Sequence, residues 1–99
     1  MEEGEQRWIA VYTRARSERS VARQLEERGL TSFVPLQRRL HKWSDRSKWV
    51  EQPLIPSYVF VLLSHPEHHR FLDIRGFVRV IMVNGRVAVL RPSEIGFLR

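Results

Sequence analysis

Apolar side chains in the first third of the chain occur in short blocks, and their spacing predicts which blocks are strands and which is a helix. Residues 8–12 combine aromatic and β-branched types, which is typical of a strand. Residues 18–28 carry apolar side chains at helical spacing, with Ser17 as a predicted N-cap and Gly29 as a predicted left-handed C-terminal cap. Residues 1–6 lack such a pattern and are predicted to form a flexible N-terminal tail.

The middle of the chain predicts a long hairpin followed by a buried strand. Residues 31–43 and 48–51 are strand-like and flank a polar turn cluster at residues 44–47, so we expect a β-hairpin with its tip there. Residues 58–63 are apolar on both alternating faces, which predicts a central strand that is covered on both sides.

The last third of the chain alternates predicted helices and strands. Asn84-Gly85 is a strong signal for a two-residue hairpin turn. The predicted elements are a helix from Pro66 that ends before Gly76, strands over residues 77–83 and 86–90, and a helix from Pro92. This order favours an α+β fold with a mainly antiparallel sheet flanked by helices. The nearest template is a ferredoxin-like or RNA-recognition-like sandwich from which the basic hairpin protrudes.

Length and composition limit the classes of protein to which the chain can belong. Its 99 residues are enough for one small domain, and the lack of cysteine excludes a disulfide scaffold and a thiol nucleophile. The longest apolar run, residues 58–63, is too short to span a bilayer, and the acidic N-terminus is not a signal peptide. The net charge of +6 favours nucleic acid, or a complex that contains it, as a partner.

Catalytic and metal-binding chemistry finds little support in the sequence. His65, His68 and His69 lie close together, but they lack the spacing of a zinc-protease motif, and a solvated start of a helix is the simpler interpretation. No nucleophile stands beside a base, and no glycine-rich loop could hold a phosphate. We therefore expect no enzyme activity, no cofactor, no metal, no membrane partner and no small-molecule substrate.

The predicted hairpin is rich in cations and tryptophans, and two interpretations stay open. It could bind phosphates while its aromatic side chains stack or anchor, or its cations could keep an exposed edge soluble. The residues concerned are Arg38, Arg39, Lys42, Trp43, Arg46, Lys48 and Trp49.

Basic residues also gather where the first predicted strand meets the helix. Because helix N-termini favour anions, this group could bind one, or it could be the solvated face of the helix. Its members are Arg14, Arg16, Arg19 and Arg23.

Tyr58 and Phe60 lie on one face of the predicted central strand. They could belong to an ordinary core, or they could form an exposed aromatic patch for a protein partner or for base stacking. The residues before them lack the basic residue and glycine of an RNA-recognition signature.

Several segments occur in an order that is specific as a set, although each alone is not. They are WIAVYT at 8–13, the helix ending at Gly29, FVPL at 33–36, WSDRSKW at 43–49, PLIPSYVFV at 53–61, RGFV at 75–78, Asn84-Gly85 and PSEI at 92–95. Over residues 7–99 the chain resembles the N-terminal domain of NusG-like transcription elongation factors. The paired tryptophans are more similar to the specialised RfaH-like and UpxY-like antiterminators than to housekeeping NusG.

The resemblance implies a bacterial, cytoplasmic factor for transcription elongation and antitermination. Members of the family bind RNA polymerase at the clamp helices of the largest subunit and face the gate loop of the second-largest subunit. By holding the clamp closed they suppress pausing, and some also bind the non-template DNA strand. The family's second domain, a KOW-type β-barrel, is expected to be absent from this chain.

The resemblance also implies roles for individual residues. The expected polymerase-binding residues are Trp8, Tyr12, Ile55, Pro56, Tyr58 and Phe60. The expected nucleic-acid-binding residues are Arg14 and Arg75, which match family positions, and Arg16 and Arg23 are added on charge alone. His68 and His69 fall near the segment that faces the gate loop. Many members have Phe where this chain has Ile55, and housekeeping members have Gly where it has Ser57.

Three functions compete on this evidence. A polymerase-binding domain requires an exposed apolar surface that includes Tyr58 and Phe60. A free-standing RNA-binding module of related fold would instead bind single strands with steep salt dependence. A small enzyme of ferredoxin-like fold would need a pocket of convergent ionisable groups, which the sequence does not offer. The ordered set of segments favours the polymerase-binding domain.

Overall fold

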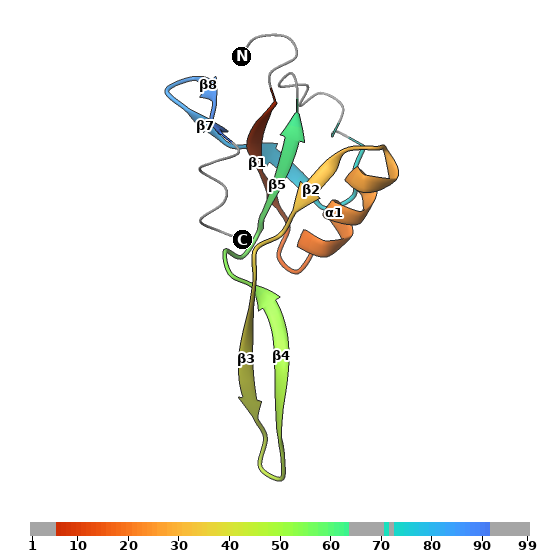
Figure 1. Cartoon of the computed structure of the whole chain (residues 1–99), viewed down its shortest axis with the longest axis vertical. Helices are drawn as coiled ribbons and strands as arrows, with labels where there is room; N and C mark the ends of the chain where they lie inside the picture. Colours follow the sequence, from red (N-terminus) through yellow and green to blue (C-terminus); the bar gives the residue numbers. More distant parts are fainter. Residues whose placement is uncertain (1–5, 64–70, 72, 92–99) are drawn as a thin grey trace.

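Strands make up most of the structure, a computed structural model that describes residues 6–63, 71 and 73–91 (Figure 1). In chain order the elements are β1 (Arg7–Thr13), α1 (Glu18–Glu27), β2 (Thr31–Phe33), β3 (Leu36–Lys42), β4 (Ser47–Pro53), β5 (Tyr58–Leu63), β6 (Phe77–Val80), β7 (Met82–Val83), β8 (Arg86–Val87) and β9 (Val89–Leu90). The fold is α+β, with a mainly antiparallel sheet and a single α-helix in the described ranges.

The central sheet has the strand order β2-β5-β1-β6, and β9 also pairs with β1. All these pairings are antiparallel. β5 therefore lies between β2 and β1, which confirms the central position predicted for residues 58–63. Its register places Tyr58 opposite Tyr12 and Phe60 opposite Ala10.

Two short strands, β6 and β9, share one edge of β1. The continuous strands predicted over residues 77–83 and 86–90 are therefore wrong in their extent. β6 pairs beside the end of β1, and β9 pairs beside its beginning. Between them the Ile81 amide donates to the Ala10 carbonyl at 2.9 Å. The chain leaves the edge there as the β7–β8 hairpin, whose neck is closed by the Ala88 amide donating to the Ile81 carbonyl at 3.0 Å.

Both hairpins form the turns that the sequence predicts. At the β7–β8 turn Asn84 and Gly85 have φ of 52° and 76°, and two successive positive values are what a type I′ turn requires. At the end of the β3–β4 hairpin the Trp43 amide donates to the Arg46 carbonyl at 2.7 Å.

Helix α1 confirms the amphipathic helix predicted after β1. Val21 and Leu25 are buried, and Gly29 beyond the helix has a φ of 82°, as a left-handed terminator should. Ser17 occupies the N-cap position, but its side chain makes no capping hydrogen bond. Its ψ of 2° departs from the extended conformation in which a cap side chain reaches the helix amides, so the predicted capping role is wrong.

The two faces of the sheet carry different side chains because successive residues of a strand point to opposite sides. On one face Val59 and Val61 of β5 join Val21 and Leu25 of α1 in the larger core cluster. The opposite face has a smaller cluster formed by Trp8 and Phe60, with Ala10, Phe33, Ile55, Leu62 and Leu90 packed against it.

The β3–β4 hairpin extends away from the sheet along the longest axis of the molecule (Figure 1). The principal extents of 55, 30 and 28 Å reflect this projection. Near its base, Nη2 of Arg19 in α1 donates to the Glu51 carbonyl at 3.4 Å, which connects the hairpin to the helix.

Some predicted elements lie outside the described residues. They are residues 1–5 of the tail, most of the helix predicted from Pro66, and the helix predicted from Pro92. Phe71 and Ile74, which are described, are buried in the larger core cluster. In the described ranges no helix has the length and apolar character needed to cross a membrane.

Candidate functional site

Aromatic side chains gather on the face of the sheet opposite α1. Tyr12 and Tyr58 face each other across β1 and β5, with ring centroids 5.7 Å apart and an edge-to-face arrangement. The Phe33 ring lies 6.4 Å from the rings of both Trp8 and Phe60. We call these five residues the aromatic face.

The aromatic face is only partly accessible. Trp8 and Phe60 are 2% and 6% exposed, so both belong to the core. The expectation that Phe60 lies on an exposed surface is therefore wrong, because Phe33 and Trp8 cover it. Tyr12 and Tyr58 are half-buried and retain accessible ring surface.

Two further predicted polymerase-binding residues border the tyrosines. Ile55 is half-buried against Trp8 and Phe60, and Pro56 is exposed. Beside them Cζ of Arg79 lies 5.4 Å from the centre of the Tyr12 ring, a cation–π contact. Arg79 was not identified from the sequence, because its contact with Tyr12 depends on the pairing of β6 with β1. The accessible surface therefore combines two aromatic rings, an apolar border and one cation.

Ser57, between Pro56 and Tyr58, is fixed in a conformation that favours glycine. Its φ is 70°, its amide donates to Oε2 of Glu18 at 2.8 Å, and its carbonyl accepts from the Thr13 amide at 2.8 Å. Glu18 is 4% exposed, so this carboxylate is buried at the start of α1. The contact between Glu18 and Ser57 could not be predicted from the sequence, because a contact over 39 residues leaves no local pattern.

Three of the predicted nucleic-acid-binding arginines meet around two adjoining surface hollows. Arg14 and Arg75 line a hollow of about 490 Å³, and Arg23 and Arg75 line another of about 330 Å³. Ser20 also borders both hollows. The remaining predicted residue, Arg16, is exposed in the loop between β1 and α1 and lines neither. We call Arg14, Arg23 and Arg75 the basic surface.

Backbone contacts hold the basic surface together. The Arg14 amide donates to the Gly76 carbonyl at 2.8 Å. The Gln24 side chain makes two hydrogen bonds to Arg75: Nε2 donates to its carbonyl at 2.9 Å, and Oε1 accepts from its amide at 3.1 Å. Gln24 was not identified from the sequence, where it is one polar residue of a solvated helix face.

Gly76 allows the turn beside Arg75 to approach α1. Its φ is 92°, and a Cβ atom built there would lie 2.8 Å from Cβ of Ser17 and 3.1 Å from Cγ2 of Val21. Any other residue would therefore meet both an unfavourable backbone conformation and a steric clash.

The acidic side chain beside the larger hollow is already paired. Nη2 of Arg28 lies 2.7 Å from Oδ2 of Asp73, and this hydrogen bond lowers the pKa of the Asp73 carboxyl from its ordinary value of 3.8. Within the part of the chain that the structure describes, Arg14, Arg23 and Arg75 form no ion pair. Glu27 also lines the smaller hollow, so the cations of the larger hollow, Arg14 and Arg75, are the most available to an anionic ligand.

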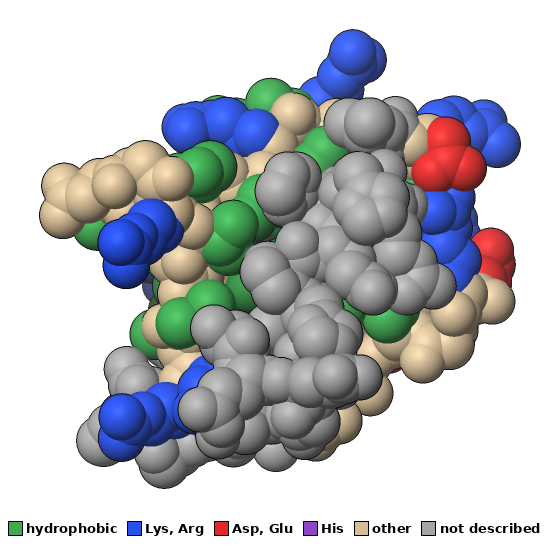
Figure 2. Space-filling model, turned by 90° about the horizontal axis from the view of Figure 1, so that it is seen from above, with side chains coloured by type: hydrophobic (Ala, Val, Ile, Leu, Met, Phe, Trp, Pro, Cys, Tyr) green, Lys and Arg blue, Asp and Glu red, His purple; other side chains and the backbone are tan. Residues whose placement is uncertain are grey.

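Viewed from the end opposite the β3–β4 hairpin, Lys and Arg side chains project at several separate points around the molecule, whereas Asp and Glu lie toward one side (Figure 2).

His68 and His69 lie outside the described residues. The described residues gather no group of three or more His, Asp or Glu that could hold a metal ion.

Comparison with known proteins identifies one family. The family model described as "Transcription termination factor nusG" matches residues 6–99. No curated protein matches the chain. The family match spans the aromatic face, the basic surface and both hairpins.

Proposed function

The chain belongs to the NusG family, and from that premise we propose that its aromatic face binds the clamp helices of the largest subunit of bacterial RNA polymerase. Family membership makes it a domain of a transcription termination or elongation factor, within a family of transcription factors rather than enzymes. The transcription machinery is thus its general partner. By bridging the cleft of the polymerase, the bound domain would suppress pausing in the bacterial cytoplasm.

The observation that carries this proposal is the accessible pair Tyr12 and Tyr58 beside Ile55 and Pro56. Half-buried rings with an apolar border present a rigid surface on which the side chains of a partner helix can pack. Trp8 and Phe60 are buried and pack against Ile55, so they would stabilise this border without touching the partner.

The basic surface supports a second part of the proposal, contact with the non-template DNA strand. Arg14, Arg23 and Arg75 surround hollows large enough for a phosphate or an unpaired nucleotide, and none is paired with an acid in the described residues. Arg16 extends the same charge along the loop before α1. The gate-loop role of His68 and His69 stays a prediction.

We also infer that the sandwich is ferredoxin-like. The support is the antiparallel strand order β2-β5-β1-β6, in which β1-α1-β2 crosses over one intervening strand. The protruding hairpin with Trp43 and Trp49 supports assignment to the specialised antiterminators rather than to housekeeping NusG.

The decisive experiment is co-elution of the chain with bacterial core RNA polymerase in size-exclusion chromatography, with isolated clamp helices as competitor. We expect co-elution that the clamp helices abolish. Tyr58→Ala should weaken binding to the clamp helices by about tenfold, because a central aromatic contact contributes on the order of 1–2 kcal/mol. Trp49→Ala, which also removes an exposed ring but lies on β4, is the matched control and should bind normally.

Failure to co-elute would contradict the proposal. The alternative of a free-standing RNA-binding module would then be favoured if the chain bound single-stranded RNA tightly and with a steep salt dependence. In that case Tyr58→Ala should weaken the binding to RNA.

A further inference from the structure

The β3–β4 hairpin exposes large apolar side chains that the core does not use. Trp43 and Trp49 are 45% and 57% exposed, and Leu36 and Leu40 are also exposed. None of them belongs to either core cluster in the described residues. A role in folding the sheet therefore does not explain these tryptophans.

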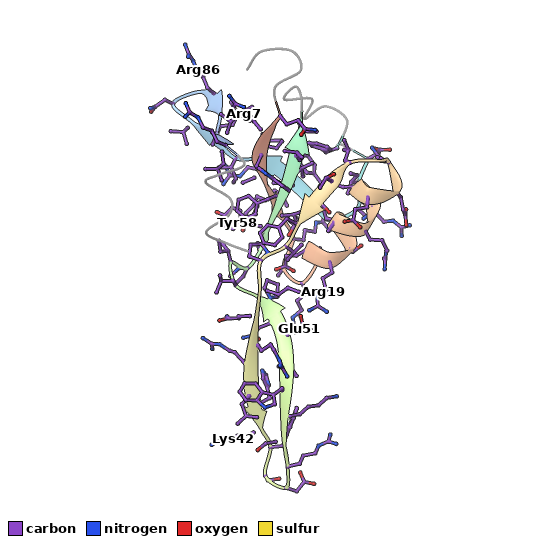
Figure 3. All side chains as sticks on the ribbon, viewed as in Figure 1. Arg7, Arg19, Lys42, Glu51, Tyr58 and Arg86 are labelled. Carbon is purple, nitrogen blue, oxygen red and sulfur yellow. The ribbon has the colours of Figure 1, made fainter. Side chains whose placement is uncertain are left out.

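The hairpin is also positively charged. Residues 36–53 contain five Lys or Arg against one Asp and one Glu, a net charge of +3. Lys42 lies toward the far end of the hairpin, whereas Glu51 lies near its base beside Arg19 (Figure 3). In the described ranges none of the five cations forms an ion pair, so their charge is not neutralised within the chain.

Two of these cations stack on the exposed tryptophans. Cζ of Arg38 lies 5.4 Å from the centre of the Trp49 ring, and Cζ of Arg46 lies 5.2 Å from that of Trp43. A guanidinium above an indole keeps its N–H groups directed outward at the ring edge, where a phosphate can accept from them. Each pair therefore places a phosphate donor beside an aromatic surface.

The register places one of these pairs on a definite face of the hairpin. Leu40 pairs with Trp49 and Arg38 with Glu51, so these residues share one face. His41 pairs with Lys48 on the other face, which also carries Arg39, and the Trp43 ring beyond the strand lies 5.8 Å from the His41 ring. Each face is thus positively charged and has one tryptophan on or beside it.

We propose that the arginine–tryptophan pairs of the β3–β4 hairpin bind single-stranded nucleic acid, at a site separate from the basic surface. The charge complements phosphates, and the indoles offer stacking surfaces for unpaired bases, a combination typical of single-strand binding. A duplex stacks its bases internally and would leave the tryptophans unused. This site goes beyond the proposed function and does not depend on docking to polymerase.

The test is a titration of the whole chain with a labelled oligo(dT) of about 15 nucleotides, a length in the range that such sites cover. Binding is followed by anisotropy and by tryptophan fluorescence. Since Trp8 is buried, quenching reports on Trp43 and Trp49. We expect quenching on binding, and a loss of affinity of at least about fivefold in Trp43→Ala with Trp49→Ala.

Two variants separate stacking from charge. Trp43→Phe with Trp49→Phe keeps the aromatic surfaces and should retain most of the affinity. Arg39→Gln with Lys48→Gln removes two charges that stack on neither tryptophan, and should reduce the salt dependence while leaving the quenching intact.

The proposal is overturned if the double alanine variant binds oligo(dT) as tightly as the original chain. It is also overturned if a duplex binds as tightly as the single strand, or if heparin, a polyanion without bases, produces the same quenching. Binding to isolated clamp helices should survive in the double alanine variant, so failure of this proposal and failure of polymerase docking are distinguishable. Arg14→Ala with Arg75→Ala should keep the quenching, because the basic surface is separate.

Discussion

Ser57 shows how a single strained residue can hold a surface in place. A non-glycine residue at a φ of 70° is disfavoured by about 1–2 kcal/mol relative to ordinary backbone. The conformation persists because Glu18 and Thr13 fix the amide and the carbonyl of the same residue. Pro56 and Tyr58 on either side are thereby held in place for the aromatic face.

Ser57→Gly should relieve this strain. We expect the free energy of unfolding to rise by up to about 1 kcal/mol, less than the full strain because glycine also makes the unfolded chain more flexible. Urea denaturation measures the change. Ser20→Gly is the matched control: it lies inside α1 and should lower stability by about 0.5–1 kcal/mol. A loss of stability in both variants would contradict the assignment of strain to Ser57.

Glu18→Ala should destabilise the domain because it leaves the part-buried amide of Ser57 without its acceptor. The expected loss is about 1–3 kcal/mol in urea denaturation. Hydrogen exchange at the Ser57 amide should also become faster. Glu18→Gln keeps an acceptor oxygen and should lose less, so equal losses in the two variants would argue against the hydrogen bond as the cause.

At the scale of elements, the turn before β6 connects the helix to the basic surface. Gln24 clamps the backbone of Arg75, the Arg28–Asp73 ion pair holds the same turn, and Gly76 permits its close approach to α1. The position of Arg75 therefore depends on contacts from α1 more than on its own side chain.

Gly76→Ala should disturb this turn. The added Cβ would face Ser17 and Val21 in a backbone conformation that alanine rarely adopts, so we expect a loss of at least about 1–2 kcal/mol in thermal or urea unfolding. Gly29→Ala is the control: its φ is also positive, but nothing lies within 4 Å of the added atom. A similar loss in both would assign the effect to φ alone and exclude the clash.

At the scale of the whole molecule, the domain presents the aromatic face on one side of its sheet, the basic surface around α1 and the projecting hairpin. These surfaces come from different elements, so a variant of one should leave the others intact. A domain that docks on a protein and contacts a nucleic acid at once requires such a separation.

Arg14→Ala with Arg75→Ala tests the separation in transcription assays. We expect the effect on pausing that depends on the transcription bubble to fall severalfold, while affinity for core polymerase changes by less than about twofold, because lost phosphate contacts do not alter the aromatic face. Pause profiles on a defined template and co-elution measure the two quantities. An unchanged pause profile would exclude these arginines from contact with DNA.

Several elements could be predicted from the amino-acid sequence because their signals are local. The spacing of apolar residues placed α1, Asn84-Gly85 specified its turn, and the apolar run at residues 58–63 indicated a central strand. These predictions succeed because helix periodicity, turn dihedral angles and strand alternation are set by residues a few positions apart. The expectation that this strand is covered on both faces holds only in part, because Tyr58 is half-buried on the aromatic face.

The accessibility of side chains and the contacts between distant groups follow from the packing of the strands and the helix. The alternation of side chains along the strand placed Tyr58 and Phe60 on one face. Phe33 and Trp8 from other strands cover Phe60, however, and leave Tyr58 partly accessible. The interrupted edge of β1 and the contact between Glu18 and Ser57 likewise join segments far apart in the chain. Burial and pairing depend on which strands lie side by side and in what register, and segments far apart in the chain decide this together.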